Sequence, residues 1–146
     1  MSTQFLNTIH RVSREVARYL EEQGLPGNLN ATEGHVIAYL AVYSPLTVGR
    51  LNTVFGLRAS TLTSILNRLE EKKLVTRKVH PRDNRSQLLD LTREGAIIAE
   101  QMHSLFEMVE ARIISFTSED EVDGFQAVMH AISQLASGKQ SPGDVG

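Results

Sequence analysis

The chain has 146 residues, of which 22% are charged and 41% apolar, and its formal net charge is −2. This composition is typical of one folded globular domain and excludes a disordered chain. No apolar run reaches the roughly 20 residues that a membrane-spanning helix needs, and the N-terminal segment lacks the pattern of an export signal. The sequence has no cysteine, which excludes disulfides, zinc–thiolate sites and a catalytic cysteine. We therefore expect a cytoplasmic protein.

Charge is distributed unevenly along the chain. Ten basic and four acidic residues lie between residues 50 and 93, so this stretch carries a net charge of +6 and the remainder carries −8. A basic centre between acidic ends favours a polyanion as the partner of the centre. An ordinary solvated surface would have the same charges, so charge alone leaves both interpretations open.

The first predicted helix covers about residues 5–20 and ends at the glycine- and proline-containing stretch that follows. Apolar residues recur every three or four positions, which places them on one face of this helix. These residues are Phe5, Ile9, Val12, Val16 and Leu20.

Several short elements are predicted in the centre of the chain. Thr32 is expected to cap a helix that ends before Pro45, and Thr47 is expected to cap a short second helix that ends at Gly56. A third helix is predicted from about Ala59 to Lys72 because leucine and isoleucine recur there at helical spacing.

Two strand-like runs follow, at residues 75–79 and 87–91, and turn-forming residues join them. This pattern predicts a β-hairpin with a longer loop. Two short helices joined at a glycine and followed by a basic hairpin are typical of a winged helix-turn-helix, in which the second helix enters the major groove of DNA.

Two more helices are predicted at the C-terminal end. Thr92 is expected to cap the first, and Ser118 and Glu121 have the spacing of a capping box for the second, which extends to about residue 136. Residues 139–146 have no apolar stripe and are expected to be disordered. The predicted fold class is therefore mainly α with a small β-hairpin wing.

We interpret residues 1–138 as a single domain. Residues 29–91 would form the winged helix-turn-helix core, and residues 1–28 and 92–138 would form dimerisation helices. Nothing else in the sequence covers the apolar faces of these terminal helices, so the same helices of a second copy are the expected partner, in an intertwined homodimer. The alternative is that the three helices cover one another within one chain.

The helix predicted at residues 59–72 has a polar side that suits contact with DNA. Its short hydroxyl and amide side chains can approach base edges and phosphates closely, and Asn67 can pair with adenine. Capping and ordinary solvation also explain the hydroxyls, above all that of Ser60. The DNA contacts predicted on this helix are Arg58, Ser60, Thr61, Thr63, Ser64, Asn67 and Arg68. Further phosphate contacts are expected from Arg50, Lys72, Arg77 and Lys78.

Arg82 and Arg85 lie in the loop of the predicted hairpin, from which arginine can enter a narrow minor groove. Asp83 stands between them and is a poor ligand for DNA because phosphate repels it. We expect Asp83 to accept a hydrogen bond from the backbone or from Arg85 and so to fix the loop. The alternative is that this loop is an ordinary solvated charged turn that makes no contact with DNA.

The stretch from residue 62 to residue 95 contains a distinctive set of motifs. These are Leu69-Glu70 before Leu74-Val75, then Arg77, Asp83-x-Arg85-Ser86 and Leu91-Thr92-x-x-Gly95. With these motifs the chain resembles the MarR family of bacterial transcription regulators. The resemblance implies an interlocked homodimer on pseudo-palindromic operator DNA, with Asn67 on the recognition helix and Arg85 on the wing. It also implies a small phenolic or amphipathic effector.

Three positions depart from this family. Lys73 stands where the family usually has a glycine, and a left-handed turn at a lysine should cost about 1 kcal/mol. Gly49 and Asn52 stand where the family often has a helix former and an alanine, so the packing of that short helix is expected to differ.

We therefore expect a DNA-binding transcription regulator, a ligand-responsive repressor, without enzymatic activity and without a cofactor or metal. A winged-helix module that binds protein is the alternative function. An enzyme has no motif to support it, since a phosphate loop and a nucleophile elbow are both absent. A metal-sensing site would have to use residues such as Glu33, His103 and Glu107. The candidate effector contacts are His10, Arg14, Tyr39, Tyr43 and Met102.

Overall fold

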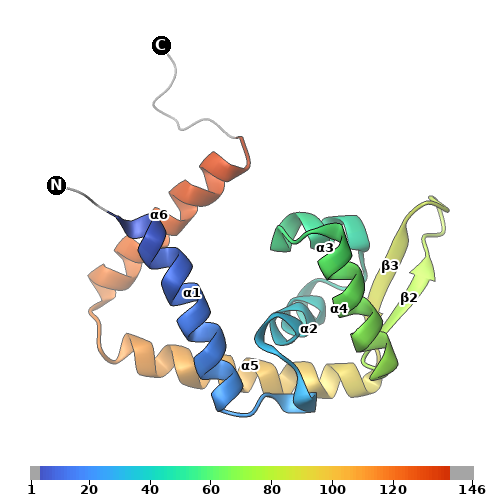
Figure 1. Cartoon of the computed structure of the whole chain (residues 1–146), viewed down its shortest axis with the longest axis horizontal. Coiled ribbons are helices and arrows are strands. Elements are labelled where there is room, and N and C mark those ends of the chain that lie inside the picture. Colours follow the sequence, from blue (N-terminus) through green and yellow to red (C-terminus); the bar gives the residue numbers. More distant parts are fainter. Residues whose placement is uncertain (1–3, 139–146) are drawn as a thin grey trace. The chain divides into compact units, whose positions relative to one another are not determined.

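The computed structural model describes residues 4–138, which form helices and a small antiparallel sheet (Figure 1). The elements are α1 (Phe5–Glu22), the 3-10 helix η1 (Pro26–Asn28), α2 (Ala31–Tyr43), β1 (Leu46–Thr47), α3 (Val48–Phe55), α4 (Ala59–Glu71), β2 (Val75–Val79), β3 (Gln87–Leu91), α5 (Arg93–Ile114) and α6 (Glu119–Ala136). The predicted fold class is confirmed. The chain divides into two compact units, one up to Ser104 and one from Leu105 onward. The predicted disordered tail lies outside the described residues.

The cap of helix α2 lies two residues before the predicted one. The side chain of Asn30 accepts the N–H of Glu33 at 2.9 Å, and Glu33 Oε1 accepts the N–H of Asn30 at 3.0 Å. The prediction that Thr32 caps this helix was therefore wrong, because Asn30 has a glutamate three residues later and forms a complete capping box with it.

Helices α3 and α4 form the helix-turn-helix, and the predicted cap of α3 is confirmed. Thr47 Oγ1 accepts the N–H of Arg50 at 3.1 Å, and the helix ends at Gly56, whose φ of 60° is left-handed. Helix α4 follows Arg58 as its N-cap and has no side-chain cap. Ser60 lies inside the first turn, so capping does not explain the presence of a hydroxyl side chain at this position.

The sheet contains one strand more than the sequence predicted. The strand order is β1-β3-β2, all antiparallel, and Leu89 of β3 pairs with Leu46 on one side and with Arg77 on the other. Strand β1 has two residues, too few for a recognisable alternation of apolar and polar side chains. Figure 1 shows that the hairpin of β2, β3 and the loop 80–86, which we call the wing, extends beyond α3 and α4.

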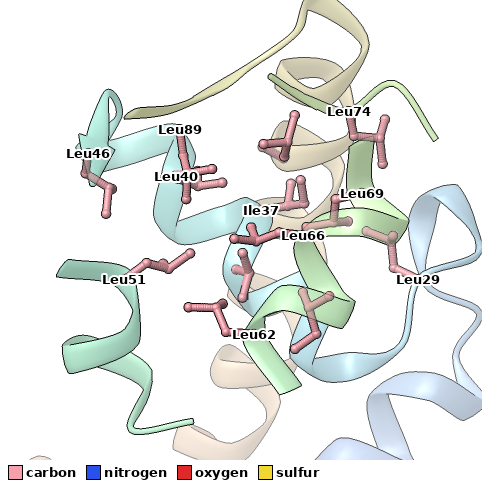
Figure 2. Packing of buried hydrophobic residues seen from close by; sticks show 14 residues of the cluster. Leu29, Ile37, Leu40, Leu46, Leu51, Leu62, Leu66, Leu69, Leu74 and Leu89 are labelled. Atoms are coloured by element: carbon pink, nitrogen blue, oxygen red, sulfur yellow. The ribbon is translucent and has the colours of Figure 1, made fainter. Parts of the chain in front are cut away.

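One face of α4 packs into a core that also takes residues from α2, α3 and the sheet (Figure 2). Leu62, Ile65, Leu66 and Leu69 of α4 are all buried, together with Ile37 and Leu40 of α2. Each such side chain contributes roughly 1.5–3 kcal/mol on burial. This packing fixes the rotation of α4 about its axis, so the opposite face of the helix is directed to solvent.

Helix α4 ends in a left-handed turn at Lys73, whose φ is 60°. The N–H of Lys73 bonds the carbonyl of Glu70 at 2.9 Å, and the N–H of Leu74 bonds the carbonyl of Leu69 at 3.0 Å. These two bonds form a Schellman motif, and its two leucines are both buried. The expected left-handed turn is confirmed at a residue that has a Cβ atom.

Replacing Lys73 with glycine should increase the free energy of unfolding by about 1 kcal/mol, because glycine adopts this φ without steric cost. Urea denaturation of the purified protein measures the change. Lys73→Ala is the matched control, since it removes the charged side chain but keeps the Cβ, and should unfold within about 0.5 kcal/mol of wild type. Equal stability of the glycine and alanine variants would contradict the prediction.

The start of α5 is tied to the end of α4. Thr92 Oγ1 accepts the N–H of Gly95 at 3.0 Å, as predicted for a cap, and donates to the carbonyl of Lys73 at 2.6 Å. The N–H of Thr92 also bonds the carbonyl of Leu74 at 3.0 Å. A Cβ atom on Gly95 would lie 2.0 Å from this Leu74 oxygen, so the close approach requires glycine.

Helix α3 contains both of the expected departures in packing. A Cβ on Gly49 would meet no atom within 4 Å, so glycine is not needed there. The Oδ1 atom of Asn52 is buried and accepts no hydrogen bond from the described residues. A buried acceptor without a partner is destabilising.

We expect Asn52→Ala to raise the free energy of unfolding by about 1 kcal/mol, because it removes the unsatisfied acceptor and replaces asparagine with a better helix former. Urea denaturation monitored by circular dichroism checks this. A variant no more stable than wild type would show that the amide finds a partner in solution.

Candidate nucleic-acid interface

The exposed face of α4 carries most of the side chains that the sequence predicted to contact bases. The exposed residues of this face are Ser60, Thr61, Thr63, Ser64 and Asn67, with Arg58 exposed at the N-terminal end of the helix. Thr63 donates its hydroxyl hydrogen to the carbonyl of Ala59 at 2.9 Å, so its oxygen remains available only as an acceptor. The helix therefore presents a polar surface of short side chains.

Arg77 projects from β2 toward α4 and is only partly exposed to solvent. Its Nε and Nη2 donate to Glu70 Oε2 at 2.9 and 2.5 Å, and Nη2 also donates to Asn67 Oδ1 at 2.5 Å. These bonds and the arginine charge hold the pKa of Glu70 below its usual value, and Glu70 raises the pKa of Arg77. Sequence reasoning missed this pair, although the family motif includes both residues.

Two other cations that the sequence predicted to contact DNA, Arg68 and Lys72, are also bonded to groups of the protein itself. Arg68 Nε lies 3.2 Å from Glu33 Oε2, and the Glu33 side chain is only 5% exposed. Lys72 Nζ donates to the carbonyls of Gly27 and Asn28 at 3.3 and 3.0 Å. These cations hold α4 against the start of α2 and the turn that precedes it, which reduces their availability to DNA.

The loop of the wing is organised by Asp83, as expected from the sequence. Asp83 Oδ1 accepts the backbone N–H of Arg85 at 3.0 Å, and Oδ2 accepts the hydroxyl of Ser86 at 3.0 Å. These two bonds hold the pKa of Asp83 below its usual value. A second support was not predicted from the sequence: His80 Nδ1 accepts the backbone N–H groups of Arg82 and Asp83 at 3.0 and 3.3 Å.

The remaining cations of α3, of the N-terminal end of α4 and of the wing are exposed, and within the described residues none of them forms an ion pair. They are Arg50, Arg58, Lys78, Arg82 and Arg85. They come from the start of α3, the start of α4 and the wing. The structure thus separates the basic residues into a set that stabilises the fold and a set that is free for an anionic partner.

Comparison with known proteins identifies the family of this chain. The sequence pattern of the MarR family matches residues 29–87. The organic hydroperoxide resistance transcriptional regulator of Bacillus subtilis is 32% identical over 103 residues, which are 69% of each chain. The transcriptional repressor MdtR of the same organism is 30% identical over 132 residues, which are 90% of this chain and 80% of MdtR. This chain belongs to the MarR family.

Solved structures of MarR-family proteins have the same fold. A cysteine-to-serine mutant of Escherichia coli MarR, complexed with operator DNA, superposes with a TM-score of 0.78 and 27% identity, covering 89% of this chain and 94% of that one. The Staphylococcus aureus MepR–DNA complex has a TM-score of 0.74 and 25% identity, covering 94% and 98%. The family predicted from the sequence motifs is therefore confirmed. The relatives are transcription regulators, which agrees with the prediction that the chain is not an enzyme.

The predicted effector contacts of this MarR-family chain lie on three helices, α1, α2 and α5. Tyr39 is half-buried and contacts two other rings, with centroids 4.4 Å away for Tyr43 and 5.6 Å away for Phe55. His10 and Arg14 are exposed on α1. The side chain of Met102 is fully buried, so it presents no surface to a ligand in this conformation.

The described residues contain no group of three histidine or acidic side chains that could hold a metal ion. Glu33, one of the three residues considered for a metal site, is instead paired with Arg68. Between residues 4 and 138, no helix is both long and apolar enough to cross a bilayer.

Proposed function

We propose that this chain is a sequence-specific DNA-binding transcription repressor of the cytoplasm, which acts as a homodimer and responds to a small effector. The observation that carries the proposal is the surface shared by α4 and the wing. The core residues on one side of α4 leave its short polar side chains exposed, and unpaired cations flank them. The net charge of +6 between residues 50 and 93 suits a polyanion.

In this proposal each part of the surface has its own role on DNA. Helix α4 lies in the major groove and reads base edges through Ser64, Asn67 and Thr63, with Arg58 at its start. The wing places Arg82 and Arg85 in the adjacent minor groove, where a narrow groove attracts arginine. Asp83 holds the loop in shape from within and does not touch DNA.

The affinity for phosphate would come from the exposed cations Arg50 and Lys78. Arg68, Lys72 and Arg77 contribute less than the sequence suggested, because each is already bonded inside the protein.

The proposed homodimer explains the apolar side chains that remain exposed on the helices outside the winged core. In α1 these are Phe5, Leu6, Val12 and Val16; in α5, α6 and the turn between them they are Ile97, Met108, Ile113, Ile114, Phe116, Phe125, Val128 and Leu135. None of the residues of α6 is buried. Apolar surface of this extent marks an interaction site, and a second copy has matching helices to cover it.

The effector is expected to act on the separation of the two α4 helices. A dimer with a fixed separation matches one spacing of half-sites, roughly 10 base pairs from centre to centre. A ligand that binds another arrangement more tightly lowers the population that fits the operator. The contacting rings of Tyr39, Tyr43 and Phe55 offer aromatic surface for a phenolic or amphipathic compound.

Selection of genomic DNA fragments by the purified protein, repeated with small phenols, tests this function. We expect a two-fold symmetric consensus, affinity that falls steeply with salt, and weaker binding with an effector. Sedimentation should give a dimer. A monomer, or a protein that selects no sequence at low salt, would contradict the proposal, and partner binding insensitive to salt would favour the protein-interaction module.

A further inference from the structure

The orientation of the Asn67 side-chain amide is determined by its neighbour Arg77. A guanidinium group has only donors, so the amide atom that faces it must be the oxygen. Arg77 Nη2 donates to this Oδ1 atom at 2.5 Å. The amide nitrogen and its two hydrogens are therefore directed to the other side of the amide group, and Asn67 lies on the exposed face of α4.

Arg77 is itself held in place by Glu70. The Arg77 side chain is 21% exposed, and both its Nε and Nη2 atoms donate to the same carboxylate oxygen. Asn67 and Glu70 are three positions apart on α4, so they lie on the same side of the helix, and Arg77 reaches both from β2. Glu70 neutralises the charge of Arg77, and the Nε and Nη2 donors of Arg77 are directed at protein atoms, which is a poor arrangement for contacting a phosphate.

We propose that Glu70 and Arg77 are positioning residues that fix Asn67 as a hydrogen-bond donor to one base in the major groove. The inference rests on the proposed function, because it requires α4 to lie in that groove. An amide that rotates freely offers a donor or an acceptor equally well and discriminates poorly. An amide fixed by Arg77 favours a base that presents an acceptor, which guanine, adenine and thymine do.

Cytosine presents only a donor in the major groove. The base that Asn67 contacts in each half-site should therefore exclude cytosine more strongly than any other base.

The test compares Arg77→Met with wild type on an operator in which every base is varied in turn. Methionine keeps the length of the side chain but removes its donors and charge. We expect discrimination against cytosine to fall on the order of 10-fold at one position per half-site. The slope of log affinity against log salt concentration should change little, because Glu70 already neutralises Arg77 and the exposed cations assigned to phosphate, Arg50 and Lys78, are retained.

Lys78→Met is the matched control, since Lys78 is the next residue of β2 and is exposed. It should keep all base preferences and reduce the salt slope by about 0.9 for each phosphate that the lysine neutralises. Glu70→Gln provides a second variant if Arg77→Met does not fold. It should weaken discrimination at the same position and retain non-specific affinity, because Arg77 keeps its charge.

Arg77→Met with intact base preferences and a reduced salt slope would overturn the inference and make Arg77 a phosphate ligand. Wild-type protein without any sequence preference would instead refute the proposed function. The two failures are thus separable in one set of measurements.

Discussion

Arg85→Ala should lower operator affinity on the order of 10- to 100-fold while leaving the dimer and the shape of the wing intact. Arg85 is exposed, and its side chain forms no ion pair within the described part of the chain. Asp83 holds the loop through the backbone N–H of Arg85, and alanine retains that group. The reduced affinity therefore reports the contact of the guanidinium with DNA. Fluorescence anisotropy with a labelled operator measures it.

Arg18→Ala is the control for charge. Arg18 is an exposed arginine of α1 and lies 3.9 Å from Glu22, a distance at which an exposed pair contributes little. Its removal changes the net charge by the same amount as Arg85→Ala and should leave affinity within about 2-fold of wild type. Operator binding by Arg85→Ala equal to that of wild type would exclude the proposed role of the wing.

Gly95→Ala should reduce the free energy of unfolding by about 3 kcal/mol. The new Cβ would lie 2.0 Å from the carbonyl oxygen of Leu74, and backbone atoms on both sides must shift to avoid the contact. The same carbonyl accepts the N–H of Thr92, so the shift would also disturb the junction between α4 and α5. Urea denaturation gives the magnitude.

Gly49→Ala is the matched control for the glycine substitution. Gly49 lies in α3 with no atom within 4 Å of the position of its Cβ, so alanine should raise stability by about 0.5–1 kcal/mol. If the free energy of unfolding falls for Gly95→Ala and rises for Gly49→Ala, the close approach of Gly95 to the Leu74 carbonyl determines the effect at Gly95. A general property of glycine in helices would change both variants in the same direction. A Gly95→Ala protein as stable as wild type would contradict the structure at this junction.

The sequence predicted the local elements well because their signals are local. Thr47, Thr92 and Ser118 each accept a backbone N–H three residues later, and the geometry of that bond depends only on neighbouring residues. The same applies to Asp83, whose partners are two and three residues away. The prediction that Thr32 caps α2 was wrong although the same local rule applies, because Asn30 also precedes the helix and is the residue with a glutamate three positions later.

The candidate site could be predicted in its position but not in its bonding. The apolar spacing of α4 determined which of its faces would be exposed, and that is where the polar residues lie. Sequence spacing says nothing about Arg68 and Glu33, which are 35 positions apart, or about Lys72 and the carbonyl of Gly27, which are 45 apart. All of these cations look alike in a sequence as candidates for phosphate contact.

The amino-acid sequence by itself determined the helices, the wing, the basic centre and the family of this protein, because each depends on composition, on spacing or on bonds between near neighbours. Only the tertiary structure decided which cations are free and which are held. Folding brings Arg77 of β2 against Glu70 and Asn67 of α4, and a donor-only guanidinium bonds whatever acceptors the packing places beside it.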